Sequence, residues 1–77
     1  MPSIQDAFLT GIKKLKDSNI QSYQIDAKIL LKYILDLDSE NFELKKNCEI
    51  SNLNLNSYFK LIKRRSEDEP VAYIVEK

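Results

Sequence analysis

The chain has 77 residues, which is too few for a catalytic α/β domain and suits one small domain with a single core. Its 43% hydrophobic content supports folding, and its 12 basic residues balance its 12 acidic ones, which excludes intrinsic disorder and a general nucleic-acid-binding charge. One glycine and two prolines disfavour a turn-rich β fold, so we expect an all-α domain, a small bundle of four to five helices.

The first predicted helix covers residues 2–17. Ser3 can cap it, and Asp6 is favourably placed near the positive end of the helix dipole. Apolar residues follow at helical spacing: Ile4, Ala7, Phe8, Ile12 and Leu15. Gly11 lies inside this helix at a cost of about 1 kcal/mol relative to alanine, which indicates either a close helix crossing or a tolerated defect.

The second predicted helix follows Ser22, a plausible cap, and is the strongest in the chain. One face carries apolar residues at helical spacing: Ala27, Leu30, Leu31, Ile34 and Leu35. Ile29 and Tyr33 are expected to widen this face. Because so much of the circumference is apolar, this helix should be the central one, against which the others pack.

A short third helix is expected from Asp38 or Ser39 to about Lys46, with Phe42 pointing inward. A further short turn is predicted over residues 48–53.

The last predicted helix is capped by Asn54 or Asn56 and ends near Ser66. Its shared face is formed by residues at helical spacing: Tyr58, Leu61, Ile62 and Arg65. An acidic turn ending in Pro70 follows it. Residues 71–75 are β-branched and aromatic, so we expect them to be extended.

A lone strand has no sheet to join, which suggests that a following domain begins near this point. Extended alternation would place Val71, Tyr73 and Val75 on one side and Ala72 and Ile74 on the other. We therefore divide the chain into a helical domain, residues 1–70, and the start of a linker, residues 71–77.

Residue types that support catalysis are scarce. There is no histidine, so Ser–His–Asp and Cys–His nucleophile systems are excluded within the chain, and Cys48 is interpreted as a small structural apolar residue. One cysteine without histidine is a poor zinc ligand set. One glycine cannot form a glycine-rich cofactor loop. The carboxylates of the hydrophilic stretch are interpreted as a solvated face: Asp36, Asp38, Glu40 and Glu43.

The single cysteine excludes an intrachain disulfide framework and favours a reduced, cytoplasmic protein. No apolar stretch approaches the roughly 20 residues that span a bilayer, and no signal-peptide core is visible, so we expect no membrane partner.

One basic cluster leaves two interpretations open. Its members are Lys60, Lys63, Arg64 and Arg65, near the end of the last predicted helix. They can complement the helix dipole and pair with the acidic residues that follow. Alternatively, Arg64 and Arg65 can hold carboxylates of a neighbouring domain or a protein partner, because guanidinium groups bind carboxylates bidentately.

Two segments carry a family resemblance. The first is the run DAKILL at residues 26–31, and the second joins Leu61, Arg64 and Arg65 to the run EPVAYI at residues 69–74. Together they resemble the N-terminal region of the HemK/PrmC methyltransferases, which modify peptide chain release factors. The second segment is the specific one, since any amphipathic helix can supply the first.

The resemblance implies a helical bundle joined through a β-hairpin linker to a catalytic domain that uses S-adenosylmethionine. That domain methylates the glutamine of the release factor's Gly-Gly-Gln motif. The family's Asn-Pro-Pro-Tyr motif and glycine-rich cofactor loop have no counterpart here. The chain therefore looks like the noncatalytic domain, whose implied role is to recognise and position the release factor.

Two positions depart from the family pattern. Asp68 stands where glycine often precedes Glu-Pro, and Glu76 stands where glycine commonly follows Tyr-Ile. Aspartate tolerates turn conformations, so the first departure is mild, whereas the second makes the linker hairpin less certain.

We predict that the release factor and the catalytic domain of the same protein are the partners of this chain. The predicted contact residues are Lys63, Arg64, Arg65 and Tyr73. No catalytic, cofactor-binding or metal-binding residue is predicted in this chain. The resemblance implies that the parent protein is a protein-glutamine methyltransferase that uses S-adenosylmethionine. The alternative is a freestanding helical nucleic-acid-binding module, which the balanced charge argues against.

Overall fold

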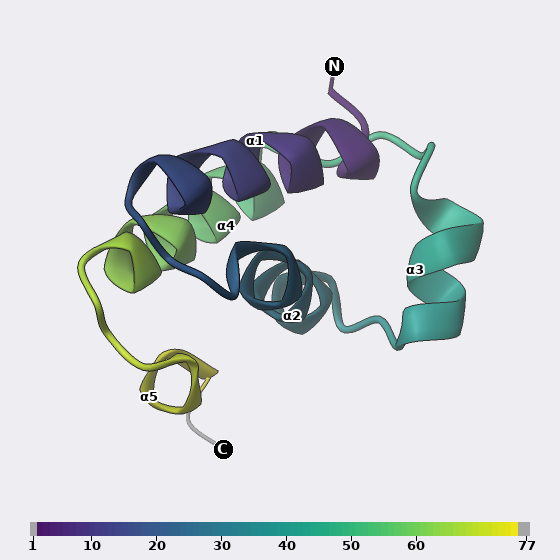
Figure 1. Cartoon of the computed structure of the whole chain (residues 1–77). Coiled ribbons are helices and arrows are strands. Elements are labelled where there is room, and N and C mark those ends of the chain that lie inside the picture. Colours follow the sequence, from purple (N-terminus) through teal and green to yellow (C-terminus); the bar gives the residue numbers. More distant parts are fainter. Residues whose placement is uncertain (1, 76–77) are drawn as a thin grey trace.

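The computed structural model describes residues 2–75, which fold into helices without a named strand. The helices are α1 (Ile4–Asp17), α2 (Tyr23–Leu35), α3 (Ser39–Lys45), α4 (Asn52–Ser66) and α5 (Val71–Val75). Figure 1 shows α1 and α4 lying along each other, α2 running across them, and α3 and α5 at opposite margins of the bundle. The predicted all-α bundle is confirmed.

The start of α1 follows the sequence prediction closely. Ser3 Oγ accepts a hydrogen bond from the Asp6 amide at 3.1 Å, and Asp6 Oδ2 accepts one from the Ser3 amide at 3.0 Å. These reciprocal bonds form a capping box, which satisfies two amides that the helix itself leaves without partners.

Gly11 marks a close helix crossing. The Tyr58 side chain of α4 is fully buried beside it, and its hydroxyl donates a hydrogen bond to the Ala27 carbonyl oxygen of α2 at 3.0 Å. A Cβ atom on Gly11 would overlap Tyr58 Oη and lie 2.9 Å from Cζ. Burial also raises the pKa of Tyr58 above its usual value. Of the two interpretations of this glycine, close packing is therefore the one observed.

α2 is the central helix, as predicted, with Ala27, Leu30 and Leu31 fully buried. However, Ile29 and Tyr33 do not widen this packed face. They are 38% and 43% exposed and lie on the outside of the bundle. Ser22 occupies the N-cap position without making a side-chain capping bond.

Left-handed residues end three helices in a chain with one glycine. Asn19, Asp36 and Asp68 all have positive φ, where glycine is usual. At Asp68 the φ is 69°, its amide donates to the Arg65 carbonyl, and the Glu69 amide donates to that of Arg64. This is a Schellman arrangement, in which Asp68 takes the left-handed conformation that glycine usually supplies.

α3 agrees with its prediction and packs through Phe42. Asp38 caps it by accepting a hydrogen bond from the Asn41 amide at 2.8 Å. The Phe42 ring is buried and meets Phe8 of α1 edge to face, with 5.6 Å between ring centroids. Cys48, by contrast, is exposed, so its interpretation as a structural apolar residue is wrong.

The segment between α3 and α4 pairs with the start of the chain. The Ile4 amide donates to the Cys48 carbonyl at 2.8 Å, and the Ile50 amide donates to that of Pro2 at 3.0 Å. Ile50 is thereby buried. In place of the short turn predicted over residues 48–53, the chain forms this backbone pairing and then begins α4 at Asn52.

α4 begins earlier than predicted. Ser51 is its N-cap and accepts a hydrogen bond from the Asn54 amide at 3.1 Å. Asn54 and Asn56 therefore lie inside the helix instead of capping it. Its predicted end at Ser66 is confirmed.

The prediction that residues 71–75 are extended is wrong, because they form α5. The Tyr73 and Ile74 amides donate to the Pro70 carbonyl at 3.0 and 3.2 Å. A helical turn satisfies these amides locally, whereas a strand without a sheet would leave them unpaired. The turn also buries Ile74 against the bundle. Residues 76 and 77 of the predicted linker, including Glu76, lie outside the described residues.

Candidate functional site

Arg65 joins the end of α4 to the start of α2. Its Nε donates to Asp26 Oδ2 at 2.8 Å, and the two side chains are only 19% and 9% exposed. Ser22 Oγ donates to the same oxygen at 2.7 Å. A buried carboxylate that receives a guanidinium and a hydroxyl is well satisfied. Arg65 is thus a structural tie between two helices.

Both arginines also hold the turn that leads into α5. Arg64 Nε donates to Glu69 Oε1 at 3.1 Å, and Arg64 Nη2 pairs with Glu69 Oε2. Arg65 Nη1 donates to the Glu69 backbone carbonyl at 3.3 Å. Of the two interpretations of the basic cluster, the structure supports pairing within the chain for these two arginines.

The four predicted contact residues differ in their accessibility and in their partners within the chain. Arg64 and Arg65 meet at Glu69, whereas Lys63 is exposed on α4 and Tyr73 is 71% exposed on α5. Their contact with a partner stays a prediction; Lys63, Arg64 and Tyr73 are exposed, whereas the Arg65 side chain is only 19% exposed.

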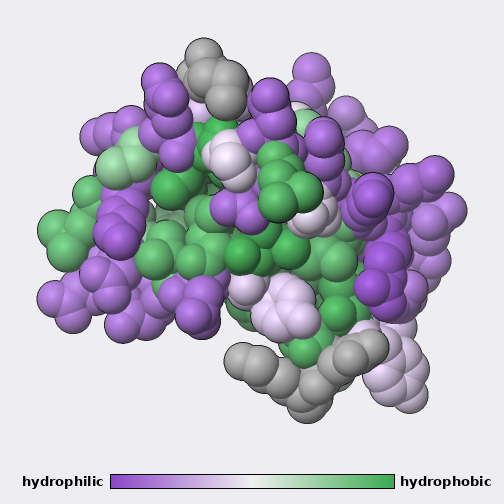
Figure 2. Space-filling model, turned by 180° about the vertical axis from the view of Figure 1, so that it is seen from behind, coloured by the Kyte–Doolittle hydropathy of each residue, from purple (hydrophilic) through white to green (hydrophobic). Residues whose placement is uncertain are grey.

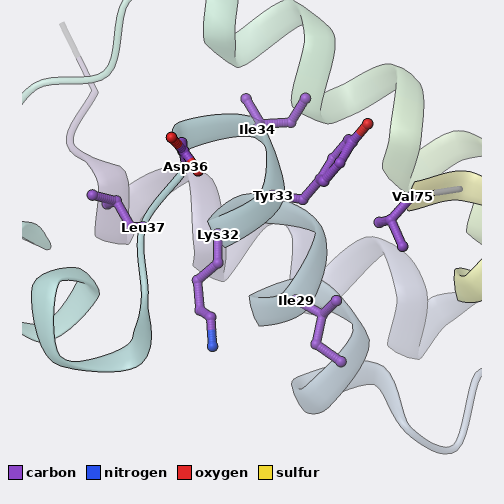
Figure 3. Close-up of a pocket in the computed structure, with 7 residues that line it drawn as sticks. All are labelled: Ile29, Lys32, Tyr33, Ile34, Asp36, Leu37 and Val75. Carbon is purple, nitrogen blue, oxygen red and sulfur yellow. The ribbon is translucent and has the colours of Figure 1, made fainter. Parts of the chain in front are cut away.

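A groove of about 580 Å³ lies beside the C-terminal half of α2. Its lining residues are Ile29, Lys32, Tyr33, Ile34, Asp36, Leu37 and Val75. Figure 3 shows the Tyr33 ring projecting from α2 on the side where Val75 of α5 lies. The Lys32 ammonium donates to Ser39 Oγ at 2.8 Å, so it already has a partner within the chain.

The groove continues an exposed apolar stripe along α2. Ile25, Ile29 and Tyr33 follow one another at intervals of four residues and are 65%, 38% and 43% exposed. With Val75 they make up what we call the α2–α5 surface. Seen from behind, the molecule carries hydrophobic residues in a band between hydrophilic margins (Figure 2). The sequence indicated that α2 is apolar around much of its circumference, but the prediction placed Ile29 and Tyr33 in the core instead of on this surface.

Residues 2–75 contain no group of three or more His, Cys, Asp or Glu placed to hold a metal ion. Every buried side-chain nitrogen or oxygen in that range has a hydrogen-bond partner. No described helix has the length and apolar character needed to cross a bilayer.

Comparison with known proteins identifies the family. Residues 6–75 match the PrmC N-terminal domain. The chain belongs to this family. Its resemblance to the HemK/PrmC methyltransferases, read from the motif around the two arginines, is confirmed. No solved structure gives a significant match.

The relatives of this PrmC N-terminal domain are methyltransferases. The chain is 35% identical over 74 residues to the release factor glutamine methyltransferase of Clostridium acetobutylicum, covering 96% of this chain and 26% of the relative. It is 33% identical over 72 residues to that of Clostridium botulinum, covering 94% and 25%. A bifunctional methyltransferase of Rickettsia felis is 30% identical over 73 residues, with 95% and 14% covered. The chain thus spans about a quarter of the length of its clostridial relatives.

Proposed function

We propose that this PrmC N-terminal domain is the noncatalytic, release-factor-recognising part of a methyltransferase. The parent protein would methylate the glutamine of the Gly-Gly-Gln motif in peptide chain release factors, in the cytoplasm. The observation that carries the proposal is the family match over residues 6–75, together with clostridial relatives named for release factor glutamine methylation.

The division of labour follows from the residue types available. When bound to the parent protein, S-adenosylmethionine supplies the methyl group, and we assign its site to the domain that follows this one. The bundle contributes a rigid body that holds the release factor in a fixed orientation. Such positioning raises rate by removing the entropy cost of bringing two reactants together. Lys63, Arg64, Arg65 and Tyr73 are proposed to contact the release factor or the catalytic domain, and all but Arg65 are exposed.

The nucleic-acid-binding alternative loses its main support in the structure. Arg64 and Arg65, half of the basic cluster, are paired with Glu69 and Asp26. Phosphate binding needs cations that face solvent together. Two of the four cluster residues are already occupied by carboxylates of the same chain.

Titration calorimetry of the 77-residue chain tests the proposal. We expect heat of binding with a purified release factor and none with S-adenosylmethionine, and no methyl transfer when both are present. Ribosomal RNA at two salt concentrations serves as the control for charge-driven binding. Specific micromolar binding of S-adenosylmethionine would contradict the assignment of the cofactor site, and absence of release-factor binding would remove the recognition role.

A further inference from the structure

α2 carries apolar side chains on both sides. Its inner residues Leu30 and Leu31 are fully buried, while the stripe of Ile25, Ile29 and Tyr33 faces outward. A helix that is apolar around most of its circumference is typical of a position with neighbours on all sides. Within residues 2–75 the bundle covers only the inner side, so the outer side is built for a contact that the described residues do not supply.

A small-molecule ligand fits this groove poorly. Ligand pockets are concave sites in which a few polar groups converge on the ligand. Here the Lys32 ammonium is held by Ser39, and the apolar residues continue out of the groove along α2 to Ile25. An elongated apolar strip of this kind suits the surface of another folded body.

The path of the chain indicates which body that is. Val75, the last described residue, forms part of the groove wall, so the backbone reaches the edge of the α2–α5 surface at this residue. The clostridial relatives are about four times as long as the matched region, and the family is described as an N-terminal domain. A domain that follows directly is tethered next to this surface, where short linkers give effective concentrations on the order of millimolar.

We propose that the domain following Val75 in the longer protein packs an apolar patch against the α2–α5 surface. This inference rests on the proposed function, because it takes the chain to be the first part of a methyltransferase. It adds the surface through which the bundle is oriented on the catalytic half: Ile25, Ile29, Tyr33 and Val75. Covering these side chains completes the burial of α2 and fixes the relative position of the two domains.

Thiol labelling tests the inference directly. Ile29→Cys is made in a Cys48→Ser background, because native Cys48 is exposed and would react as well. The rate of maleimide labelling is measured by mass spectrometry of the tryptic peptide, in the 77-residue chain and in the full-length protein. We expect labelling at position 29 to be about tenfold or more slower in the full-length protein, because the tethered domain covers the site most of the time.

Leu44→Cys in the same background is the matched control. Leu44 is an exposed apolar residue of α3, 74% accessible and outside the groove lining, so its labelling rate should be the same in both proteins. Tyr33→Cys is a second probe of the α2–α5 surface, in case the first variant folds poorly. Circular dichroism checks the folding of each variant.

Each outcome separates this inference from the proposed function. Equal labelling at position 29 in the two proteins overturns the inference, even where the full-length protein still methylates the release factor. Slow labelling in the 77-residue chain that depends on its concentration would assign the surface to a second copy. Protection that appears only after a release factor is added would assign it to the substrate. Protection without any methyl transfer would uphold the surface and defeat the function.

Discussion

α1 and α2 have similar lengths, but their outer faces differ in polarity. α1 buries Ile4, Ala7, Gly11 and Leu15, and its exposed residues are polar or charged except for Leu9, which is 52% exposed. α2 buries an inner face as completely, yet presents isoleucine and tyrosine outward. A helix that only closes this bundle needs a polar outer face, as in α1. The apolar outer face of α2 indicates a second contact.

The largest expected effect on the free energy of unfolding is at the inner side of α2, and it is measured against a substitution on the outer side. Leu31→Ala in the 77-residue chain should lower the free energy of unfolding by about 2–5 kcal/mol, because it leaves a cavity in a fully buried site. Ile29→Ala should lower it by only about 1 kcal/mol, because that side chain is 38% exposed and leaves no enclosed cavity. Urea denaturation followed by circular dichroism measures both.

Similar losses at positions 31 and 29 would contradict the distinction between an inner and an outer face. The effect of Ile29→Ala can also be compared between the 77-residue chain and the full-length protein. In the full-length protein, Ile29→Ala should become more destabilising than in the 77-residue chain, since its side chain is proposed to be covered.

A smaller effect is expected at the tie between α4 and α2. Arg65→Ala should lower the free energy of unfolding by about 1.5–3 kcal/mol, because Asp26 loses a charge-assisted hydrogen bond in a buried position. Arg65→Lys should recover only part of this loss, since an ammonium cannot reach Asp26 and the Glu69 carbonyl with the same geometry. Urea denaturation of the wild type, Arg65→Ala and Arg65→Lys tests the predicted order of their free energies of unfolding.

Arg65→Ala also tests the proposed function in the full-length protein. Because the bond between Arg65 and Asp26 lies beside the turn into α5, its loss should reduce the proposed methylation of an intact release factor more than it reduces affinity for S-adenosylmethionine. Equal activity with wild type would leave Arg65 an ordinary stabilising residue, and equal losses of both would indicate general misfolding.

The smallest effect concerns the turn that places α5 against α2. Asp68→Gly should raise the free energy of unfolding by about 0.5 kcal/mol, because glycine adopts positive φ without the steric cost that aspartate bears there. Glu67→Gly is the control. Glu67 has a φ of −96°, so glycine relieves nothing at this position and should give no gain in thermal stability. A gain at both positions would attribute the effect to something other than backbone conformation.

The sequence predicted a helix end correctly where the capping residues lie within one turn of each other. Ser3 caps α1 as predicted, and Asp6, predicted only to favour the helix dipole, also returns a hydrogen bond to the Ser3 amide, because both residues lie within one turn. The start of α4 was predicted at Asn54 or Asn56, whereas Ser51 is the observed cap. Ile50, directly before Ser51, is buried and its amide donates to the Pro2 carbonyl, a contact that is distant in sequence.

The C-terminal segment and the site depend on tertiary structure. Residues 71–75 have β-forming side chains, but the bundle offers no strand to pair with and a hydrophobic place for Ile74. The bond between Arg65 and Asp26 spans 39 positions, and no periodic pattern reports such a contact. The groove likewise forms only because Val75 lies beside α2. The predicted extended conformation of residues 71–75 gave no indication of this contact.

The pairing of the chain's first residues with the segment before α4 has a consequence for local opening. The Ile4 and Gln5 amides, in the first turn of α1, are satisfied by the carbonyls of Cys48 and Lys46. Closing a loop of more than forty residues to make these bonds carries an entropy cost that the first turn of α1 cannot recover by itself. The two segments should therefore come apart together, as one cooperative unit, whenever either one frays. In hydrogen exchange, the Ile4 and Ile50 amides would then share a single opening free energy although they are far apart in sequence.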